Sequence, residues 1–207
     1  MDEQIIHFTQ NDYEITKREI LYKGFFRMVR NHIRHKKFDG TWTNEFSREV
    51  VERPSAVAVL PYDPILDHVV LIEQFRPGAL ANPESPWLIE IIAGIYGNND
   101  IPEKTAIRET QEEGGLEVLD LYPIYEYFVS PGGSTESLRI YCAHINASAA
   151  GGVFGLDEEN EDIRAFALPL EDALKLTYTG RIKTSPAIIA LQWLQLNHEW
   201  LKQLWQK

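Results

Sequence analysis

The stretch that decides the fold runs from residue 94 to residue 116 and reads GIYGNNDIPEKTAIRETQEEGGL. Residues 102–114 are predicted to form a helix, because glycines follow at its end, where helices commonly stop. On this helix Glu109, Glu112 and Glu113 have the spacing i, i+3 and i+4, which places three carboxylates on one face. Such a face is either an ordinary solvated surface or a site that binds a cation.

Electrostatics favour a cation site. Two carboxylates held about 4 Å apart repel each other by about 4 kcal/mol at an effective dielectric constant near 20. Arg108 can reach Glu112 at i+4, but one guanidinium group cannot neutralise three carboxylates. Hard oxygen ligands clustered without His or Cys suit Mg²⁺. Because exposed acidic helix faces are common, the trio alone does not identify the site.

The stretch also resembles the Nudix box, whose pattern is Gly-x5-Glu-x7-Arg-Glu-U-x-Glu-Glu-x-Gly-U, where U is a bulky apolar residue. The matching residues are Gly94, Arg108, Glu109, Glu112, Glu113, Gly115 and Leu116. Chance agreement at the six matched Gly, Arg and Glu positions is on the order of one in ten million per start position. The chain therefore resembles the Nudix hydrolase family.

Two positions depart from this pattern. Asp100 stands where the family has Glu, and Thr110 stands where it has an apolar residue. In the family, the carboxylate at the first of these two positions mainly supports the arginine of the helix, so we expect Asp100 to be tolerated there. Asp100 followed by Glu103 also resembles a capping box, which predicts that Asp100 caps the helix start. Thr110 is expected to weaken packing without changing the chemistry.

The resemblance extends along nearly the whole chain to the ADP-ribose pyrophosphatase branch of the family. The segments that carry it are residues 21–26, 71–76, 130–133, 158–163 and 190–196. It implies an α+β protein with the Nudix fold, an α/β/α sandwich with a mixed β-sheet, preceded by a small antiparallel β domain. We expect an N-terminal dimerisation domain at residues 1–53 and a catalytic domain at residues 54–207.

Local patterns agree with this division. Residues 13–53 alternate apolar and polar in several places and contain the pair Asp39-Gly40, a strong hairpin signal. Later strands are expected at residues 56–60, 69–75, 88–92, 122–129, 138–145 and 163–168. Helices are expected at residues 102–114, 171–177 and 186–206. The last helix is apolar around much of its circumference, so we expect it to be buried between layers or at a subunit interface.

The composition is that of a folded protein without a nucleic-acid or membrane partner. The 207 residues are 44% apolar and 25% charged, close to globular averages. A net charge of −11 argues against extended nucleic-acid binding, although a metal cation could bridge an acidic pocket to a phosphorylated ligand. The apolar runs are far shorter than the roughly 18 residues of a membrane span, and no secretory signal is visible. Cys142 is the only cysteine, which excludes an intrachain disulfide and fits a cytoplasmic location.

The resemblance implies a metal site made of three carboxylates and one backbone oxygen. These are Glu109, Glu113, Glu161 and the carbonyl of Ala93. Glu112 would support the same arrangement, and Arg108 would complete the catalytic part of the helix. Mg²⁺ is the expected metal, with Mn²⁺ as an alternative. The bound metal would neutralise the diphosphate, orient a water molecule and stabilise the leaving phosphate.

The attacking water must lose a proton, and in this branch the base lies in a mobile acidic loop. Glu159 occupies the matching position, with Glu161 as the alternative base. Without the box, residues 157–162 would be interpreted as an acidic surface loop. Because the box is present, we favour a loop that supplies the catalytic base. The three glycines within residues 151–155 would give the loop the freedom to close over the substrate.

Five further residues match positions that bind the ligand in this branch. They are Arg48, Arg76, Glu136, Phe25 and Phe26. The arginines suit bidentate phosphate contacts, although a surface salt bridge is an equally good account of either one alone. Glu136 and the phenylalanines match ribose and adenine contacts supplied partly across a homodimer. For the phenylalanines, ordinary core packing is the alternative.

These residues together predict a Mg²⁺-dependent enzyme that hydrolyses the diphosphate bond of ADP-ribose to AMP and ribose 5-phosphate. Another nucleoside diphosphate sugar, such as GDP-mannose, is an alternative, because the box does not define the contacts to the base. A non-catalytic module that binds nucleotides as a sensor is a third hypothesis, and the intact carboxylates of the box argue against it. We expect Glu113→Gln nearly to abolish turnover and to leave the fold intact, because it removes a metal ligand on a helix side that is expected to face solvent.

Overall fold

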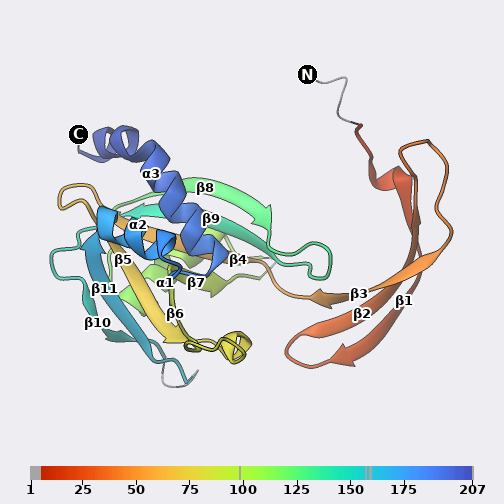
Figure 1. Cartoon of the computed structure of the whole chain (residues 1–207), viewed down its shortest axis with the longest axis horizontal. Helices are drawn as coiled ribbons and strands as arrows, with labels where there is room; N and C mark the ends of the chain where they lie inside the picture. The colour runs from red at the N-terminus through yellow and green to blue at the C-terminus, as the bar shows by residue number, and fades with distance from the viewer. Residues whose placement is uncertain (1–5, 98, 157, 159, 207) are drawn as a thin grey trace. The chain divides into compact units, whose positions relative to one another are not determined.

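The chain forms two compact units (Figure 1). The first comprises Met1–Pro54 and Phe128–Glu136, and the second comprises Ser55–Tyr127 and Ser137–Lys207. This computed structural model describes residues 6–97, 99–156, 158 and 160–206. The assignment of residues 1–53 to dimerisation and of residues 54–207 to catalysis stays a prediction.

The first unit is a three-stranded antiparallel sheet in the order β1-β2-β3. Its strands are β1 (Tyr13–Lys23), β2 (Arg27–His35) and β3 (Phe46–Glu52), after a short 3-10 helix η2 (Gln10–Asp12). In the β2–β3 connection the carboxylate of Asp39 accepts the N–H of Thr41 at 2.8 Å, and Gly40 has φ +83°. The Asp-Gly pair therefore forms a turn between two antiparallel strands, as the sequence predicts.

The second unit contains an eight-stranded mixed sheet in the order β10-β11-β5-β4-β9-β8, with β6 paired to β5 and β7 paired to β4. Its strands are β4 (Ala56–Asp63), β5 (His68–Phe75), β6 (Trp87–Glu90), β7 (Ile92–Ile95), β8 (Asp120–Phe128), β9 (Ser137–His144), β10 (Gly151–Phe154) and β11 (Ile163–Pro169). A 3-10 helix, η3 (Pro77–Ala79), follows β5. The pair β4–β9 is parallel, whereas β5 runs antiparallel to β4, β6 and β11.

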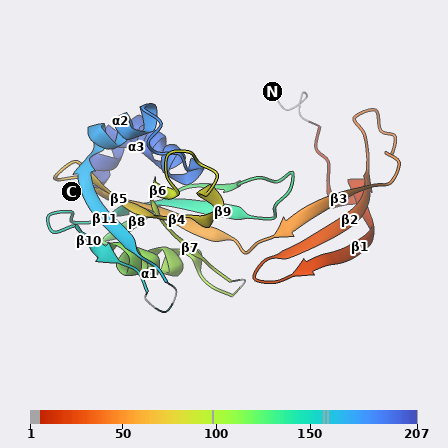
Figure 2. The same cartoon turned by 60° about the horizontal axis from the view of Figure 1, so that its bottom comes forward.

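Three helices cover the two faces of this sheet. They are α1 (Pro102–Gly114) on one face, and α2 (Leu170–Tyr178) and α3 (Ser185–Trp205) on the other (Figure 2). Alternate residues of β4 point to opposite faces, so Val57 packs in the cluster that includes Ala106 of α1, and Ala58 packs in the cluster with Leu191 of α3. The predicted α/β/α sandwich is confirmed. Within the described residues, no helix combines the length and apolar character needed to span a membrane.

Helix α1 ends as predicted but begins differently. Gly115 follows it with φ +63°, the left-handed conformation that stops a helix. The predicted cap at Asp100 is wrong, because Ile101 is the cap residue and Pro102 occupies the first turn. The carboxylate of Asp100 instead accepts the N–H of Gly97 at 2.7 Å. Thr110 is fully buried, and its hydroxyl donates to the carbonyl of Ala106 at 2.7 Å.

Two sequence-based expectations for other segments need correction. The strand expected at residues 88–92 is interrupted, because the chain changes its pairing partner between β6 and β7. Gly151 and Gly152 lie in strand β10, paired with β11, rather than in a loop free to close. On α3 Leu191, Leu194 and Leu201 are buried, as expected for a helix that packs on a sheet, whereas Leu196 is 84% exposed.

Candidate active site

Strands β4 and β5 pair at one end and separate at the other, which leaves a fork between them. The two strands pair directly only at Tyr62↔Val69 and Asp63↔His68. Beyond that point β7 pairs with β4 and β6 pairs with β5, so the two short strands fill the space between them. This fork between β4 and β5 brings Ala93 of β7 next to the acidic face of α1, because Ala93 donates its N–H to Glu113.

Glu113 is a buried carboxylate, so the expectation that it faces solvent is wrong. The residue is 4% exposed, and its carboxylate accepts the N–H of Ala93 at 3.0 Å. Burial raises the pKa of Glu113 to about 8, against the lowering effects of the Ala93 hydrogen bond and of Arg76. The nearby charges of Glu109 and Glu161 raise this pKa further. A cation placed here would be favoured, because it would compensate a buried negative charge.

Glu109 lies between Arg108 and the backbone of β7. Its carboxylate pairs with Arg108 at 2.5 Å, and a Cβ atom on Gly94 would collide with it. The glycine that opens the box pattern is therefore required by close packing against this carboxylate. Burial raises the pKa of Glu109, and the guanidinium of Arg108 opposes the shift. Arg108 also pairs with Glu112, so one arginine bridges two carboxylates of the box.

Glu161 lies in a loop that is closed by its own backbone. The N–H of Glu161 donates to the carbonyl of Leu156 at 3.2 Å, and its carboxylate accepts the N–H of Leu156 at 3.4 Å. Gly155 has φ +106°, and a Cβ atom there would collide with Glu161. The charge of Glu161 acts on both Glu109 and Glu113. Glu159, the predicted base, lies outside the described residues, and its role stays a prediction.

These carboxylates have the donor chemistry of a site for a hard cation. Glu109, Glu113 and Glu161 offer only oxygen atoms, and the charges of Glu109 and Glu161 both raise the pKa of Glu113. Among the residues that the structure describes, no three His, Cys, Asp or Glu side chains gather into an arrangement that could hold a metal ion. In this structure the carboxylate of Glu109 pairs with Arg108, and the carboxylate of Glu113 accepts the N–H of Ala93.

Arg76 belongs to the same region, and the structure adds a partner that the sequence missed. The Nε atom of Arg76 donates to Glu90 at 2.6 Å, and the side chain of Glu90 is mostly buried. Arg76 also lowers the pKa of Glu113, so its charge lies near the acidic cluster. In this structure Arg76 therefore forms a salt bridge, which was the alternative to a phosphate contact. Glu90 was hidden in an apolar run, and only the strand pairing reveals its partner.

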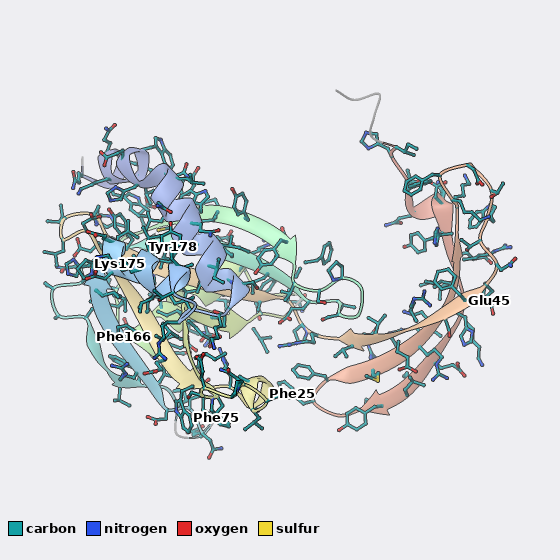
Figure 3. All side chains as sticks on the ribbon, viewed as in Figure 1. Phe25, Glu45, Phe75, Phe166, Lys175 and Tyr178 are labelled. Carbon is teal, nitrogen blue, oxygen red and sulfur yellow. The ribbon has the colours of Figure 1, made fainter. Side chains whose placement is uncertain are left out.

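The other predicted ligand residues lie in the first unit. The guanidinium of Arg48 stands 4.7 Å from the ring centre of Phe46, and no carboxylate of the described residues pairs with it. Glu136 pairs with Arg53 at 3.1 Å, and Arg53 also covers the ring of Phe26 at 4.6 Å. Core packing does not account for Phe25, which is 86% exposed at the β1–β2 turn (Figure 3).

Comparison with known proteins identifies the family. A NUDIX domain model matches residues 52–188, which is more than half of the chain. The chain belongs to the Nudix family. Members of this family generally use a divalent metal ion, which agrees with the carboxylate cluster on α1. The matched range contains the buried Glu113 and its hydrogen-bond partner Ala93 in β7.

Several relatives and one solved structure resemble this Nudix protein closely. It is 42% identical to an ADP-ribose pyrophosphatase of Escherichia coli (strain K12) over 200 residues, 97% of this chain and 96% of that one. A Haemophilus influenzae ADP-ribose pyrophosphatase is 41% identical over 207 residues, 99% and 95% of the two chains. A Shigella flexneri GDP-mannose pyrophosphatase is 38% identical over 156 residues, 73% and 78% of the two chains. The crystal structure of an ADP compounds hydrolase has a TM-score of 0.71 at 20% identity and covers 97% of this chain and 100% of its own, which shows the fold alone.

Proposed function

We propose that this Nudix protein hydrolyses ADP-ribose to AMP and ribose 5-phosphate with the help of Mg²⁺. The observation that carries the proposal is 41–42% identity to proteins named ADP-ribose pyrophosphatase, over nearly the full length of both chains. Water adds to one phosphorus atom of the diphosphate, and the bond from that phosphorus to the bridging oxygen breaks. Both products then carry a terminal phosphate.

The residues of the second unit suit the chemical step. Glu109, Glu113, Glu161 and the carbonyl of Ala93 would hold the metal, which when bound supplies charge neutralisation and an activated water. Burial of Glu113 supports this role, because a buried carboxylate without a cation favours its protonated form. Glu112 supports Arg108, which pairs with both Glu109 and Glu112.

The proton of the water would go to a carboxylate of the acidic loop. Glu159 is the proposed base, and Glu161 is the alternative because its charge already acts on the buried carboxylates of α1. A Glu159→Gln variant is expected to retain metal binding and to lose most of its kcat. A near-normal kcat for this variant would transfer the role to Glu161.

The residues of the first unit suit substrate binding within a homodimer. Arg48 would contact phosphate together with Arg76 of the second unit, whereas Glu136, Phe25 and Phe26 would contact ribose and adenine. The exposure of Phe25 is compatible with a binding role, because its ring is free to contact a ligand. The three-stranded sheet also buries few apolar side chains by itself, which supports covering by a second copy.

Product analysis tests the reaction directly. The protein is stripped of metal with EDTA, supplied with Mg²⁺ and ADP-ribose, and sampled by chromatography. AMP and ribose 5-phosphate are expected in equal amounts, and in H₂¹⁸O the label is expected in one of the two phosphates. Parallel reactions with Mn²⁺ and without metal test the choice of ion. A complete lack of AMP from ADP-ribose with Mg²⁺ contradicts the proposal.

A second candidate substrate is GDP-mannose, favoured by the 38% identity to a GDP-mannose pyrophosphatase. A panel of nucleoside diphosphate sugars compared by kcat/KM decides between them. We expect ADP-ribose to lead this panel, because the match to the ADP-ribose pyrophosphatases is both closer and longer. The relatives named above are pyrophosphatases, so they give no support to a non-catalytic sensor.

We also propose that the enzyme works in the cytoplasm without a nucleic-acid partner. Its single cysteine, Cys142, is buried and cannot form an intrachain disulfide. The net charge of −11 disfavours contact with a phosphate backbone. Localisation of the tagged protein by fractionation tests the first part, and retention on immobilised DNA at low salt would contradict the second.

A further inference from the structure

One buried amide in the second unit has no partner. Gln74 is 6% exposed, and its Nε2 atom has no hydrogen-bond acceptor among the described residues. A buried donor without an acceptor is destabilising, and native proteins contain few of them. Because Gln74 lies beside the residues of the proposed site, its unpaired donor calls for a functional explanation.

Strand geometry places Gln74 on the same face as Arg76. Val70 and Ile72 pack in the cluster on the α1 side, and alternation continues this face to Gln74 and then to Arg76. The neighbouring residue Phe75 belongs to the opposite face. The row that contains Gln74 therefore runs under α1 and ends at the arginine near Glu113.

The register with β6 brings Glu90 within reach of this row. Gln74 pairs with Leu88, and Ile72 pairs with Glu90, so Glu90 is the diagonal neighbour of Gln74. Diagonal neighbours of antiparallel strands are within reach of long side chains. Arg76 lies two residues beyond Gln74 on the same face, and its backbone N–H donates to the carbonyl of Pro86. Its guanidinium extends back along the strand past Gln74 and reaches Glu90.

We propose that Gln74 is a positioning residue that receives Glu90 when Arg76 turns to the diphosphate of the substrate. In the present arrangement the guanidinium satisfies Glu90, and the amide of Gln74 has no acceptor. When Arg76 binds the anionic ligand, the mostly buried carboxylate of Glu90 loses its donor. The Nε2 group of Gln74 then donates to that carboxylate, which removes two unsatisfied polar groups at once. This inference rests on the proposed function only for the role of Arg76 as a diphosphate ligand.

The amide suits this exchange because it is neutral. A lysine at the same position would compete permanently with Arg76 for Glu90 and would add positive charge beside a site for a cation. An apolar residue would leave Glu90 unpaired whenever Arg76 moved away, and that penalty would oppose ligand binding. A neutral donor avoids both effects.

A double-mutant cycle tests the proposal with inorganic diphosphate, the group shared by all the candidate substrates. Affinity is measured by calorimetry in the presence of Mg²⁺ for the unmodified protein, Gln74→Met, Glu90→Gln and the double variant. Gln74→Met keeps the side-chain length and is expected to weaken binding by about tenfold, the size of one hydrogen bond to a charged group. In the Glu90→Gln background the same change is expected to have a much smaller effect.

Thermal melting separates this role from a purely structural one. Because the donor of Gln74 has no acceptor in the free protein, Gln74→Met is expected to leave Tm unchanged or to raise it. Glu73→Gln is the matched control, since Glu73 is adjacent in β5, lies on the opposite face and pairs with Arg164 at 2.6 Å. It is expected to keep the unmodified affinity.

Three results would overturn the inference: unchanged diphosphate affinity in Gln74→Met, an equal loss in both backgrounds, or no diphosphate binding by the unmodified protein. Failure of the proposed function is a separate result. It would appear as absent hydrolysis of ADP-ribose, whereas the binding cycle does not depend on turnover or on the nucleoside.

Discussion

The two units of the chain are stabilised in different ways. In the second unit the sheet is covered on both faces, and side chains such as Leu60, Leu71 and Leu194 are fully buried. In the described part of the first unit, Val29 is the one buried apolar residue, whereas Ile20 is 58% exposed. An apolar core stabilises the second unit by itself, and the first unit requires a covering partner to bury comparable surface.

Polar cross-strand pairs take the place of a core in the first unit. Arg30 pairs with Glu49 at 2.7 Å and Arg34 pairs with Glu14 at 2.6 Å. Exposed pairs of this kind contribute little to stability, because solvent screens their charges. They help to define strand register, because cross-strand pairs of opposite charge are favourable and like charges directly opposite each other are not. The proposed reacting groups therefore lie on the well-packed second unit. Several proposed binding groups lie instead on the first unit, whose sheet needs a covering partner.

The largest expected effect concerns the reacting groups of the second unit. Glu113→Gln is expected to lower kcat by about a thousandfold, on the order of the loss seen when one electrostatic contact to a transition state is removed. The amide oxygen can still accept the N–H of Ala93, and no charge is buried, so Tm should not fall. Kinetics with saturating ADP-ribose and Mg²⁺, together with a thermal melt, measure both quantities.

Glu117→Gln is the matched control for this experiment, because Glu117 is an exposed carboxylate four residues further on. It should keep the unmodified kcat. A Glu113→Gln protein that loses its folded circular dichroism spectrum would instead assign Glu113 a structural role and would weaken the contrast between a rigid reacting unit and a binding unit.

The next effect concerns the apolar core. Leu194→Ala is expected to reduce the free energy of unfolding by about 3 kcal/mol, because it removes a fully buried side chain and leaves a cavity. Leu196→Ala, two residues away on α3, should change it by less than about 0.5 kcal/mol, because Leu196 is already exposed. Urea unfolding followed by tryptophan fluorescence compares the two. Equal losses of unfolding free energy would mean that the surface of α3 around Leu196 is covered in solution.

A smaller effect is expected when the surface of the first unit that a second copy would cover is made charged. Ile20 shares a face with Val29 and Val50, its neighbours in the sheet register. Ile20→Glu should raise the dissociation constant of the homodimer by at least about tenfold, because it places a charge on a surface that association would bury. Light scattering over a dilution series measures this constant.

Ile65→Glu provides the comparison, since Ile65 is an exposed apolar residue of the second unit. Its dimer should be as stable as that of the unmodified protein. If both variants dissociate equally, or if the unmodified protein is monomeric and fully active, covering of the first unit by a second copy is ruled out.

The smallest expected effect is a change in how the stability of the protein falls at acid pH. The carboxylate of Asp67 accepts hydrogen bonds from His198 at 2.6 Å and from Tyr62 at 2.8 Å. Burial alone would raise the pKa of Asp67, but these hydrogen bonds outweigh it and lower the pKa. A lowered pKa in the folded state means that the contribution is present at neutral pH and is lost as the pH falls from about 4 through the folded value.

Asp67→Asn should therefore flatten the acid limb of a plot of urea midpoint against pH, while the neutral midpoint falls modestly. Asparagine tolerates the positive φ of +57° at this position. In the first unit, which has little apolar core, hydrogen bonding to Lys36 and Thr9 lowers the pKa of Asp12 to about 2. Solvent screening should make the acid limb of Asp12→Asn nearly that of the unmodified protein, and a larger effect there than at Asp67 would reverse the comparison.

Sequence patterns predicted the elements that depend on local interactions. Residues 102–114 were predicted and found as α1, because backbone hydrogen bonds of a helix are local and a left-handed glycine ends it. The Asp39-Gly40 turn was predicted for the same reason. The cap at Asp100 failed because proline in the first turn moved the cap residue to Ile101.

Several site properties depended on pairing between distant segments and were not predictable. The spacing of the acidic residues predicted a shared helix face but not the burial of Glu113, which follows from the packing of α1 against β7. Glu90 belongs to no recognisable motif, and the motif at residues 71–76 predicts no role for Gln74. Their relation to Arg76 arises only because β6 pairs with β5 in a particular register.

The sequence by itself determined the family, the acidic helix and the mixed α+β character, because these follow from residue spacing, glycine conformation and apolar periodicity along short stretches. The tertiary structure decided which carboxylate is buried, which arginine is held by which glutamate, and which amide is left without an acceptor. The physical reason is that burial and strand pairing join residues far apart in the chain, and local sequence does not specify those partners.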